Sequence, residues 1–327
     1  MYTGSRVMRS VLNAEYLKFY FGCVYEIGEW EECVFWLRGL NDTYRVRTSE
    51  GMFILRVYRV GIGENGVVYE TALLNQLKEE LRGVATKVAE PVPTVRGTYF
   101  TTVDAPEGRR MAVMFRYIEG EESGLQDEPS CYAFGQSAAE LHAAMDRISV
   151  VRPRYKLDTD FLINEPLECI VEYIGRNHEQ ASFLTAFANG LKARIEAACG
   201  QGLDYGICHG DMHGNNNAIV ENGRFVHFDF EWAAAGWRAY DLAQVKGRKR
   251  QQPDNREKLW AALLEGYRSV RPFSERDEQA IDLFFMARRL WVMSLDVAFI
   301  PGDMGAIDYG EDWLNGFVEE FKAAALL

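Results

Sequence analysis

The chain has 327 residues, of which 48% are hydrophobic and 26% are charged, and its formal net charge is -12. This length suits a globular protein with one large or two smaller cores. So acidic a chain is a poor partner for nucleic acid, because nonspecific binding to a phosphate backbone depends on Lys and Arg. We therefore expect no nucleic-acid partner.

The cysteines and the hydropathy pattern indicate a cytoplasmic protein. None of the six cysteines forms a Cys-x-x-Cys pair, so neither a zinc site nor a disulfide framework is indicated. Charged residues interrupt residues 1–20, and no later stretch is apolar enough to cross a bilayer. We expect no membrane partner, and the sequence does not indicate an oligomeric state.

The first third of the chain has the pattern of short strands around one helix. The expected strands cover residues 33–37, 43–48, 53–60, 97–102 and 111–118, and the expected helix covers residues 67–81. Gly51 marks a hairpin between the second and third strands. The pattern predicts an antiparallel sheet with one main helix.

After Gly120 the apolar residues recur at three- and four-residue spacing, which is typical of helices. The expected helices cover residues 132–145, 182–198, 257–270 and 280–298. The polar, glycine-containing stretch 119–124 is the expected hinge. The chain is therefore predicted to be α+β and bilobal, with a sheet lobe over residues 1–118 and a mostly helical lobe over residues 119–327.

Asp211 and Asn216 are five positions apart, the offset between the catalytic Asp and the metal-binding Asn of the protein-kinase catalytic loop. Phosphoryl transfer also needs a carboxylate that orients the attacking hydroxyl and accepts its proton. Asp211 is the predicted base.

An Asn-Gly pair at positions 222–223 lies between two apolar runs and predicts a hairpin. With these two residues as the loop, Glu221 faces Arg224 and Asn216 faces Asp229, so an amide oxygen and a carboxylate point together at the open end. Glu231 lies on the same face if the strand continues. Asn216, Asp229 and Glu231 are the predicted Mg²⁺ ligands.

The run His209-Gly210-Asp211-x-His213-x-x-Asn216, followed by Phe228-Asp229-Phe230-Glu231 and Tyr240-Asp241-Leu242-Ala243, resembles the aminoglycoside phosphotransferase and choline kinase group. The resemblance covers roughly residues 35–300 and implies a protein-kinase-like fold that uses ATP and Mg²⁺.

By this resemblance Asp211 is the catalytic base, and Asn216 and Asp229 bind magnesium. Arg56 contacts the nucleotide phosphates and pairs with Glu70, and the sheet lobe binds the nucleotide. Adenine bonds to the backbone of the hinge at Arg116 and Ile118. Two departures stand out, since many kinases have Lys in place of Arg56, and the glycine-rich loop is reduced to Gly39.

Four other polar residues are expected to support the loop rather than to react. His209 and His213 are interpreted as bracing the loop backbone through hydrogen bonds. His142, in the helical pattern of residues 132–145, is interpreted as structural. Asp241 is expected to cap a helix and tether the catalytic loop.

The sequence thus predicts an ATP- and Mg²⁺-dependent transfer of the γ-phosphate to a hydroxyl of a small molecule, such as an amino alcohol, an amino acid such as homoserine, or an aminoglycoside. Three alternatives stay open: a protein serine/threonine kinase, a nucleotide-binding regulatory module without turnover, and an NAD-dependent oxidoreductase. The last rests on Gly61-Ile62-Gly63-Glu64-Asn65-Gly66, a formal G-x-G-x-x-G between a strand and a helix. It is disfavoured because the preceding strand holds Arg56, Tyr58 and Arg59, whereas the first strand of a dinucleotide-binding sheet is nearly all apolar.

Overall fold

The structure is a computed structural model that describes residues 7–149, 155–214, 217–220, 223–246, 255–300, 302 and 305–325. Its backbone contacts divide the chain into two compact units. The sheet unit comprises Met1–Glu122, Arg147–Arg154 and Asn217–Glu231. The helical unit comprises Ser123–Asp146, Tyr155–Asn216 and Trp232–Leu327.

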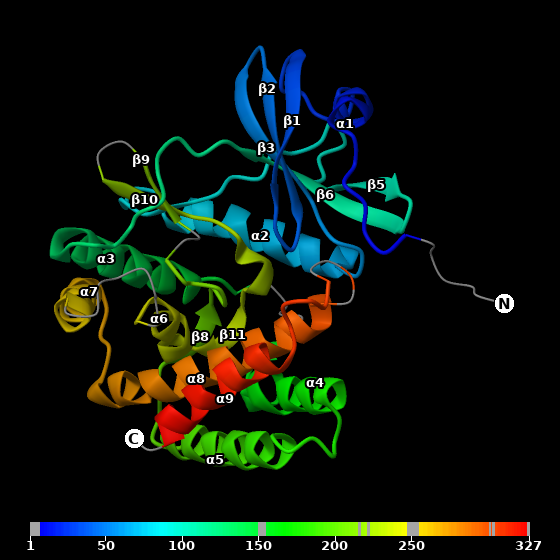
Figure 1. Cartoon of the computed structure of the whole chain (residues 1–327). Helices are drawn as coiled ribbons and strands as arrows, with labels where there is room; N and C mark the ends of the chain where they lie inside the picture. Colours follow the sequence, from blue (N-terminus) through cyan, green and yellow to red (C-terminus); the bar gives the residue numbers. More distant parts are fainter. Residues whose placement is uncertain are drawn as a thin grey trace. The chain divides into compact units, whose positions relative to one another are not determined.

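A five-stranded antiparallel sheet in the order β1-β2-β3-β6-β5 forms the body of the sheet unit (Figure 1). Its strands are β1 (Trp30–Arg38), β2 (Asp42–Thr48), β3 (Gly51–Val57), β5 (Thr101–Ala105) and β6 (Gly108–Arg116). The predicted hairpin at Gly51 is confirmed, because Thr48 pairs with Gly51 across a two-residue loop. The strand expected over residues 97–102 begins only at Thr101.

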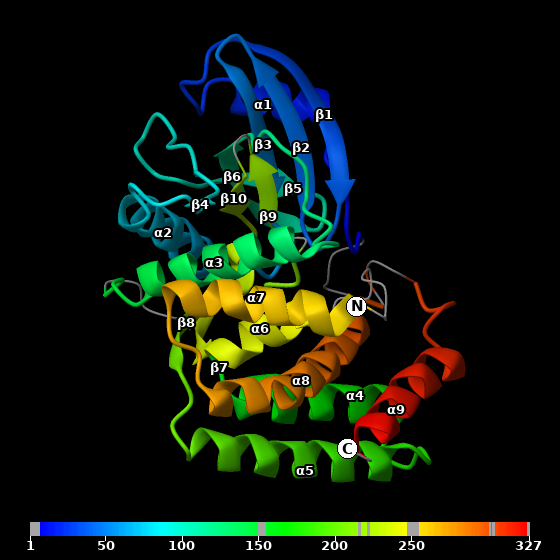
Figure 2. The ribbon, with the colours of Figure 1, turned by 90° about the vertical axis from the view of Figure 1, so that its left-hand side faces the viewer.

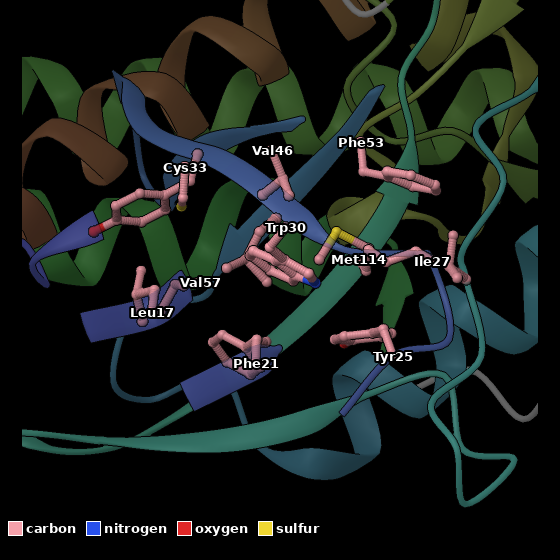
Figure 3. Packing of buried hydrophobic residues seen from close by; sticks show 14 of the residues in the cluster. Leu17, Phe21, Tyr25, Ile27, Trp30, Cys33, Val46, Phe53, Val57 and Met114 are labelled. Atoms are coloured by element: carbon pink, nitrogen blue, oxygen red, sulfur yellow. The ribbon is translucent and has the colours of Figure 1, made fainter. Parts of the chain in front are cut away.

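Two helices belong to the sheet unit, α1 (Ala14–Phe21) and α2 (Glu64–Glu80). The predicted helix corresponds to α2, whereas α1 was not predicted. Leu17 and Phe21 of α1 are fully buried and pack with Trp30, Val46 and Met114 of the sheet (Figure 3). The Asn13 side chain accepts hydrogen bonds from the amides of the first turn and so starts α1.

A second sheet in the sheet unit has the order β4-β10-β9, with β4 (Lys87–Val88) parallel to β10 (Arg224–His227) and β9 (Asn217–Val220) antiparallel to it. The predicted register of this hairpin is wrong by one residue. Arg224 pairs with Val220, so residues 221–223 separate the paired ends instead of the expected two. Gly223, the last of the three, has φ +69°, the left-handed conformation that ends a three-residue hairpin loop.

The one-residue shift removes the argument that Asn216 faces Asp229. The ladder ends with Asn217 paired to His227, and Asp229 lies beyond it. The strand does not continue to Glu231 either, because Phe230–Trp232 form a 3₁₀ helix. Asn216 and Asn222, the predicted first residue of the hairpin loop, lie outside the described residues.

The helical unit contains the helices predicted from the three- and four-residue spacing. They are α3 (Glu128–Met145), α5 (Ala181–Cys199), α7 (Arg256–Val270) and α8 (Glu275–Phe299). The unit also holds α4 (Glu165–Ile174), α6 (Arg238–Lys246), α9 (Glu311–Ala325), a π-helical turn at Asp160–Asn164 and a small sheet β7-β11-β8 (Lys156–Leu157, Ala234–Trp237 and Tyr205–Cys208). Helices α3 and α7 lie side by side, and α4 packs on α8 (Figures 1 and 2).

An antiparallel sheet unit and a mostly helical unit confirm the predicted α+β class. The strand before the G-x-G-x-x-G segment, β3, lies between two antiparallel neighbours. A dinucleotide-binding fold would place this strand in a parallel sheet, so that alternative is wrong. None of the described helices is long and apolar enough to cross a membrane.

Candidate active site

The loop that carries Asp211 follows β8 and is hydrogen-bonded to Asp241, in the first turn of α6. The Asp241 side chain is fully buried. Its carboxylate accepts hydrogen bonds from the amides of His209, at 2.6 Å, and Gly210, at 2.9 Å. The predicted tether of the catalytic loop is confirmed. The predicted helix cap is wrong, because Asp241 lies inside α6 and its carboxylate bonds to the loop.

His142 extends this network into α3 and α7. Its Nε2 lies 3.0 Å from Asp241 Oδ2, and its Nδ1 lies 2.8 Å from the hydroxyl of Tyr267. Burial lowers the pKa of His142 to about 4, so the ring is neutral near pH 7. A neutral ring that donates from Nε2 accepts from Tyr267 at Nδ1, and Asp241 stays ionised because its hydrogen bonds outweigh its burial and lower its pKa. The structural role expected for His142 is confirmed.

The backbone of the loop is fixed at two further points. The amide of Asp211 donates to Nδ1 of His209 at 3.3 Å, which is the bracing role expected for His209. Gly210 has φ +81°, and a Cβ there would lie 2.1 Å from the carbonyl oxygen of Trp232. Only glycine fits this position, so the loop takes one conformation directly before Asp211.

The carboxylate of Asp211 is 14% exposed and forms an ion pair with Arg288 of α8. Its Oδ2 lies 3.6 Å from Nε2 of His213. Arg288 also donates to the Gly210 carbonyl and to the Tyr240 hydroxyl, both at 3.3 Å. Arg288 was not predicted from the sequence, because it is 77 positions from Asp211 and belongs to no local motif.

In the sheet unit, Arg56 of β3 lies between two carboxylates. Its Nη1 is 3.4 Å from Glu70 Oε1 and 2.8 Å from Asp229 Oδ1, so the predicted pairing with Glu70 is confirmed. The hydroxyl of Tyr58 donates to the other Glu70 oxygen at 2.7 Å. Burial raises the pKa of Glu70 to about 7 although Arg56 opposes the rise.

Asp229 and Glu231, both predicted as metal ligands, lie in different environments. Asp229 is 31% exposed and has φ +68°, a strained conformation of the kind that persists at functional sites. Glu231 is 3% exposed, is paired with Arg59, and accepts from the Asn41 side chain. Asn41 also accepts from the Arg59 amide at 3.0 Å, so the carboxylate of Glu231 holds the β1–β2 turn to the end of β3.

The donor set fits Mg²⁺ only in part. Among the described residues no three His, Cys, Asp or Glu side chains are grouped as metal ligands. Mg²⁺ commonly keeps several waters and uses one or two protein ligands together with substrate phosphates. Asp229 suits that mode of binding, because it is partly exposed and pairs with Arg56 through Oδ1. Glu231 does not, because it is buried and its two oxygens bind Arg59 and Asn41.

The backbone groups of Arg116 and Ile118, the two predicted contacts to adenine, differ in their hydrogen bonding. The amide of Arg116 donates to the Glu90 carbonyl at 2.9 Å, which leaves only the Arg116 carbonyl as a candidate for adenine. The amide of Tyr117 donates to the Met52 carbonyl at 3.2 Å. Within the described part of the chain the Ile118 amide has no acceptor.

An antiparallel sheet with a buried Arg-Glu pair, and a helical unit with a tethered Asp loop, are the two halves of a protein-kinase-like phosphotransferase. Comparison with solved structures agrees on the fold. An amicoumacin kinase solved with AMP-PNP and Ca²⁺ superposes with a TM-score of 0.76 at 17% identity, covering 95% of this chain and 94% of that one. A microcompartment-associated aminopropanol kinase gives a TM-score of 0.72 at 20% identity, covering 95% of each chain.

Residues 37–273 match the model of the phosphotransferase enzyme family, and the chain belongs to that family. This membership makes it a phosphotransferase. An uncharacterized protein of Deinococcus radiodurans is 38% identical over 268 residues, which cover 79% of this chain and 75% of that protein. A homoserine kinase of Neisseria meningitidis is 26% identical over 260 residues, which cover 78% of this chain and 79% of that enzyme.

Proposed function

We propose that the chain transfers the γ-phosphate of ATP, with Mg²⁺, to a hydroxyl of a small molecule such as an amino alcohol, an amino acid or an aminoglycoside. The observation that carries the proposal is the position of Asp211, on a loop whose two preceding amides are held by the buried Asp241. A carboxylate so fixed is preorganised to receive a hydroxyl. The homoserine kinases among the relatives and the kinases among the structural neighbours are consistent with a small-molecule acceptor.

In the proposed reaction the acceptor hydroxyl donates a hydrogen bond to Asp211. Its oxygen forms a bond to the γ-phosphorus while the bond from that phosphorus to the β–γ bridging oxygen breaks. The hydroxyl proton passes to Asp211 and ADP leaves. A bound Mg²⁺ would neutralise charge on the phosphate oxygens.

Nucleotide binding is assigned to residues 1–118, and catalysis and acceptor binding to residues 119–327. Arg56, oriented by Glu70, is the proposed phosphate contact, and the Ile118 amide and Arg116 carbonyl are the proposed contacts to adenine. Asp229 and Asn216 are the proposed metal ligands. We do not propose Glu231 as a Mg²⁺ ligand, because Arg59 and Asn41 already bind its carboxylate.

A coupled assay of ADP release tests the proposal. The purified chain is incubated with ATP, Mg²⁺ and a panel of amino alcohols, hydroxyamino acids, sugars and aminoglycosides, and phosphorylated products are identified by mass spectrometry. We expect release that depends on one acceptor class and stops when EDTA removes the metal. ATP binding without transfer to any acceptor would favour a regulatory module, and transfer to itself or to a general protein substrate would favour a protein kinase.

A further inference from the structure

Arg288 lies beside the proposed base, Asp211, and forms an ion pair with it. Its Nη2 pairs with Oδ1 of Asp211, and its Nη1 donates to the Gly210 carbonyl and the Tyr240 hydroxyl. A hydroxyl oxygen bonded to Oδ1 of Asp211 therefore lies within about 6 Å of Nη2 of Arg288, since each hydrogen bond spans about 2.8 Å. The charge that an acceptor carries next to its hydroxyl therefore affects how tightly it binds.

The guanidinium of Arg288 keeps donors for a ligand. An arginine has five N–H donors, and three of them account for the contacts with Asp211, Gly210 and Tyr240. Within the described residues the Nε hydrogen and one Nη2 hydrogen have no acceptor. Such charged N–H donors match the oxygens of a carboxylate. The side chain is 13% exposed, so this part of the molecule is not sealed from solvent.

Aromatic rings fix the plane of Arg288. Its guanidinium lies 4.4 Å from the ring centre of Trp291, which is 5% exposed. Trp291 in turn packs edge-on against Trp232 at 4.8 Å and contacts Phe161 at 6.4 Å. A cation over an aromatic face with packed support loses little further freedom when it binds a second anion.

We propose that the acceptor is a short hydroxy acid or hydroxyamino acid whose carboxylate binds to the remaining N–H donors of Arg288 while its hydroxyl bonds to Asp211. The inference rests on the proposed phosphotransfer and names its substrate class. A guanidinium at this distance attracts a carboxylate and repels an ammonium group placed at the same point. Amino alcohols and aminoglycosides, which lack the carboxylate, are therefore expected to be poor acceptors.

A simpler role for Arg288 is to orient Asp211. That role would affect every acceptor equally, so the test compares acceptors that differ only in the acid group. The matched pairs are 4-hydroxybutyrate with 4-hydroxybutyramide, and L-homoserine with L-homoserine amide, and 3-amino-1-propanol serves as a cationic acceptor. Values of kcat/KM come from ADP release, and binding in the presence of Mg²⁺ and a nonhydrolysable ATP analogue is followed by tryptophan fluorescence.

We expect the wild-type chain to prefer the carboxylate member of a pair by roughly 100-fold, because a site built for an anion rejects the analogue that lacks it. Arg288→Gln should reduce this preference to about threefold or less, and Arg288→Lys should restore part of it. Arg289→Gln is the matched control. Arg289 is the next residue, but it pairs with Glu320 at 2.7 and 2.9 Å and stacks on Phe317, so the preference should stay unchanged.

Equal values for acid and amide in the wild-type chain, in turnover and in binding, would overturn the inference and leave the phosphotransferase proposal standing. A preference that survives in Arg288→Gln would also overturn it. Acid-selective binding that Arg288→Gln abolishes, without any ADP release, would support the anion site and contradict the proposed phosphotransfer. The two proposals can therefore fail separately.

Discussion

Replacing Asp241 with Asn should loosen the catalytic loop without removing any group that touches the substrates. One carboxylate accepts from the amides of His209 and Gly210 and from the His142 ring, at 2.6, 2.9 and 3.0 Å. Asn offers one acceptor oxygen and a donating NH₂ in the same space. In either orientation of the amide, one loop N–H faces a donor.

The expected loss of stability follows from this geometry. A buried donor left without an acceptor costs about 1–3 kcal/mol, and the remaining hydrogen bonds lose their charge assistance, so we expect a total of about 2–4 kcal/mol. Because Gly210 directly precedes Asp211, a shift of the loop should also lower kcat by about 100-fold. Thermal unfolding by circular dichroism and coupled ADP release measure the two effects.

Asp277→Asn is the matched control. Asp277 is also buried, at 3% exposure, and its carboxylate accepts from the amides of Asp204, at 2.8 Å, and Ser274, at 3.3 Å. It caps α8 and does not bond to the loop, so this variant should lose similar stability and keep its kcat below the melting temperature. Wild-type kcat in Asp241→Asn, or equal kcat losses in the two variants, would refute the tether.

Two further expectations concern pH and metal dependence. His142 has a folded pKa of about 4 against an ordinary 6.5, so the unfolded chain binds the extra proton first and stability falls as the pH drops from 6.5 to 4, by about 1.4 kcal/mol per pH unit. The difference in unfolding free energy between the wild type and His142→Gln should shrink over this window, and a constant difference would contradict a buried neutral ring. Asp229→Asn should raise the Mg²⁺ concentration for half-maximal rate at least about tenfold. Glu231→Gln should change this concentration less than about threefold. It should instead lower Tm, because Glu231 is bound to Arg59 and Asn41. A larger effect of Glu231→Gln than of Asp229→Asn in a Mg²⁺ titration would show that Glu231 is a metal ligand.

Local patterns in the sequence were sufficient for most of the fold. Apolar spacing identified α3, α5, α7 and α8 because each is long and has one buried face. The eight-residue α1 was missed, since so short a helix shows barely two turns of periodicity and is stabilised by its packing on the sheet.

The hairpin before Asp229 shows where local reasoning stops. Asn-Gly is common in two-residue loops, but a glycine in the left-handed conformation also closes a three-residue loop, and the two differ by one step in register. Pairing of Arg224 with Val220 decides for the longer loop. The sequence alone does not distinguish them.

In the candidate active site, too, local motifs predict some residues and only tertiary packing reveals others. Asp211 and Asp241 belong to contiguous motifs, so the sequence could propose a role for each. Arg288 could not, because it is brought to Asp211 only by the packing of α8 in the helical unit, and Glu231 has the residue type of a metal ligand but the contacts of a structural carboxylate.

The role of Asp211 is tested most directly by Asp211→Asn, with kcat measured by ADP release and nucleotide affinity measured by calorimetry with a nonhydrolysable ATP analogue and Mg²⁺. We expect kcat to fall by about 1,000-fold or more with affinity for the nucleotide nearly unchanged, because the side chain acts on the acceptor hydroxyl. Loss of nucleotide affinity with kcat retained at saturation would show that Asp211 is not the base.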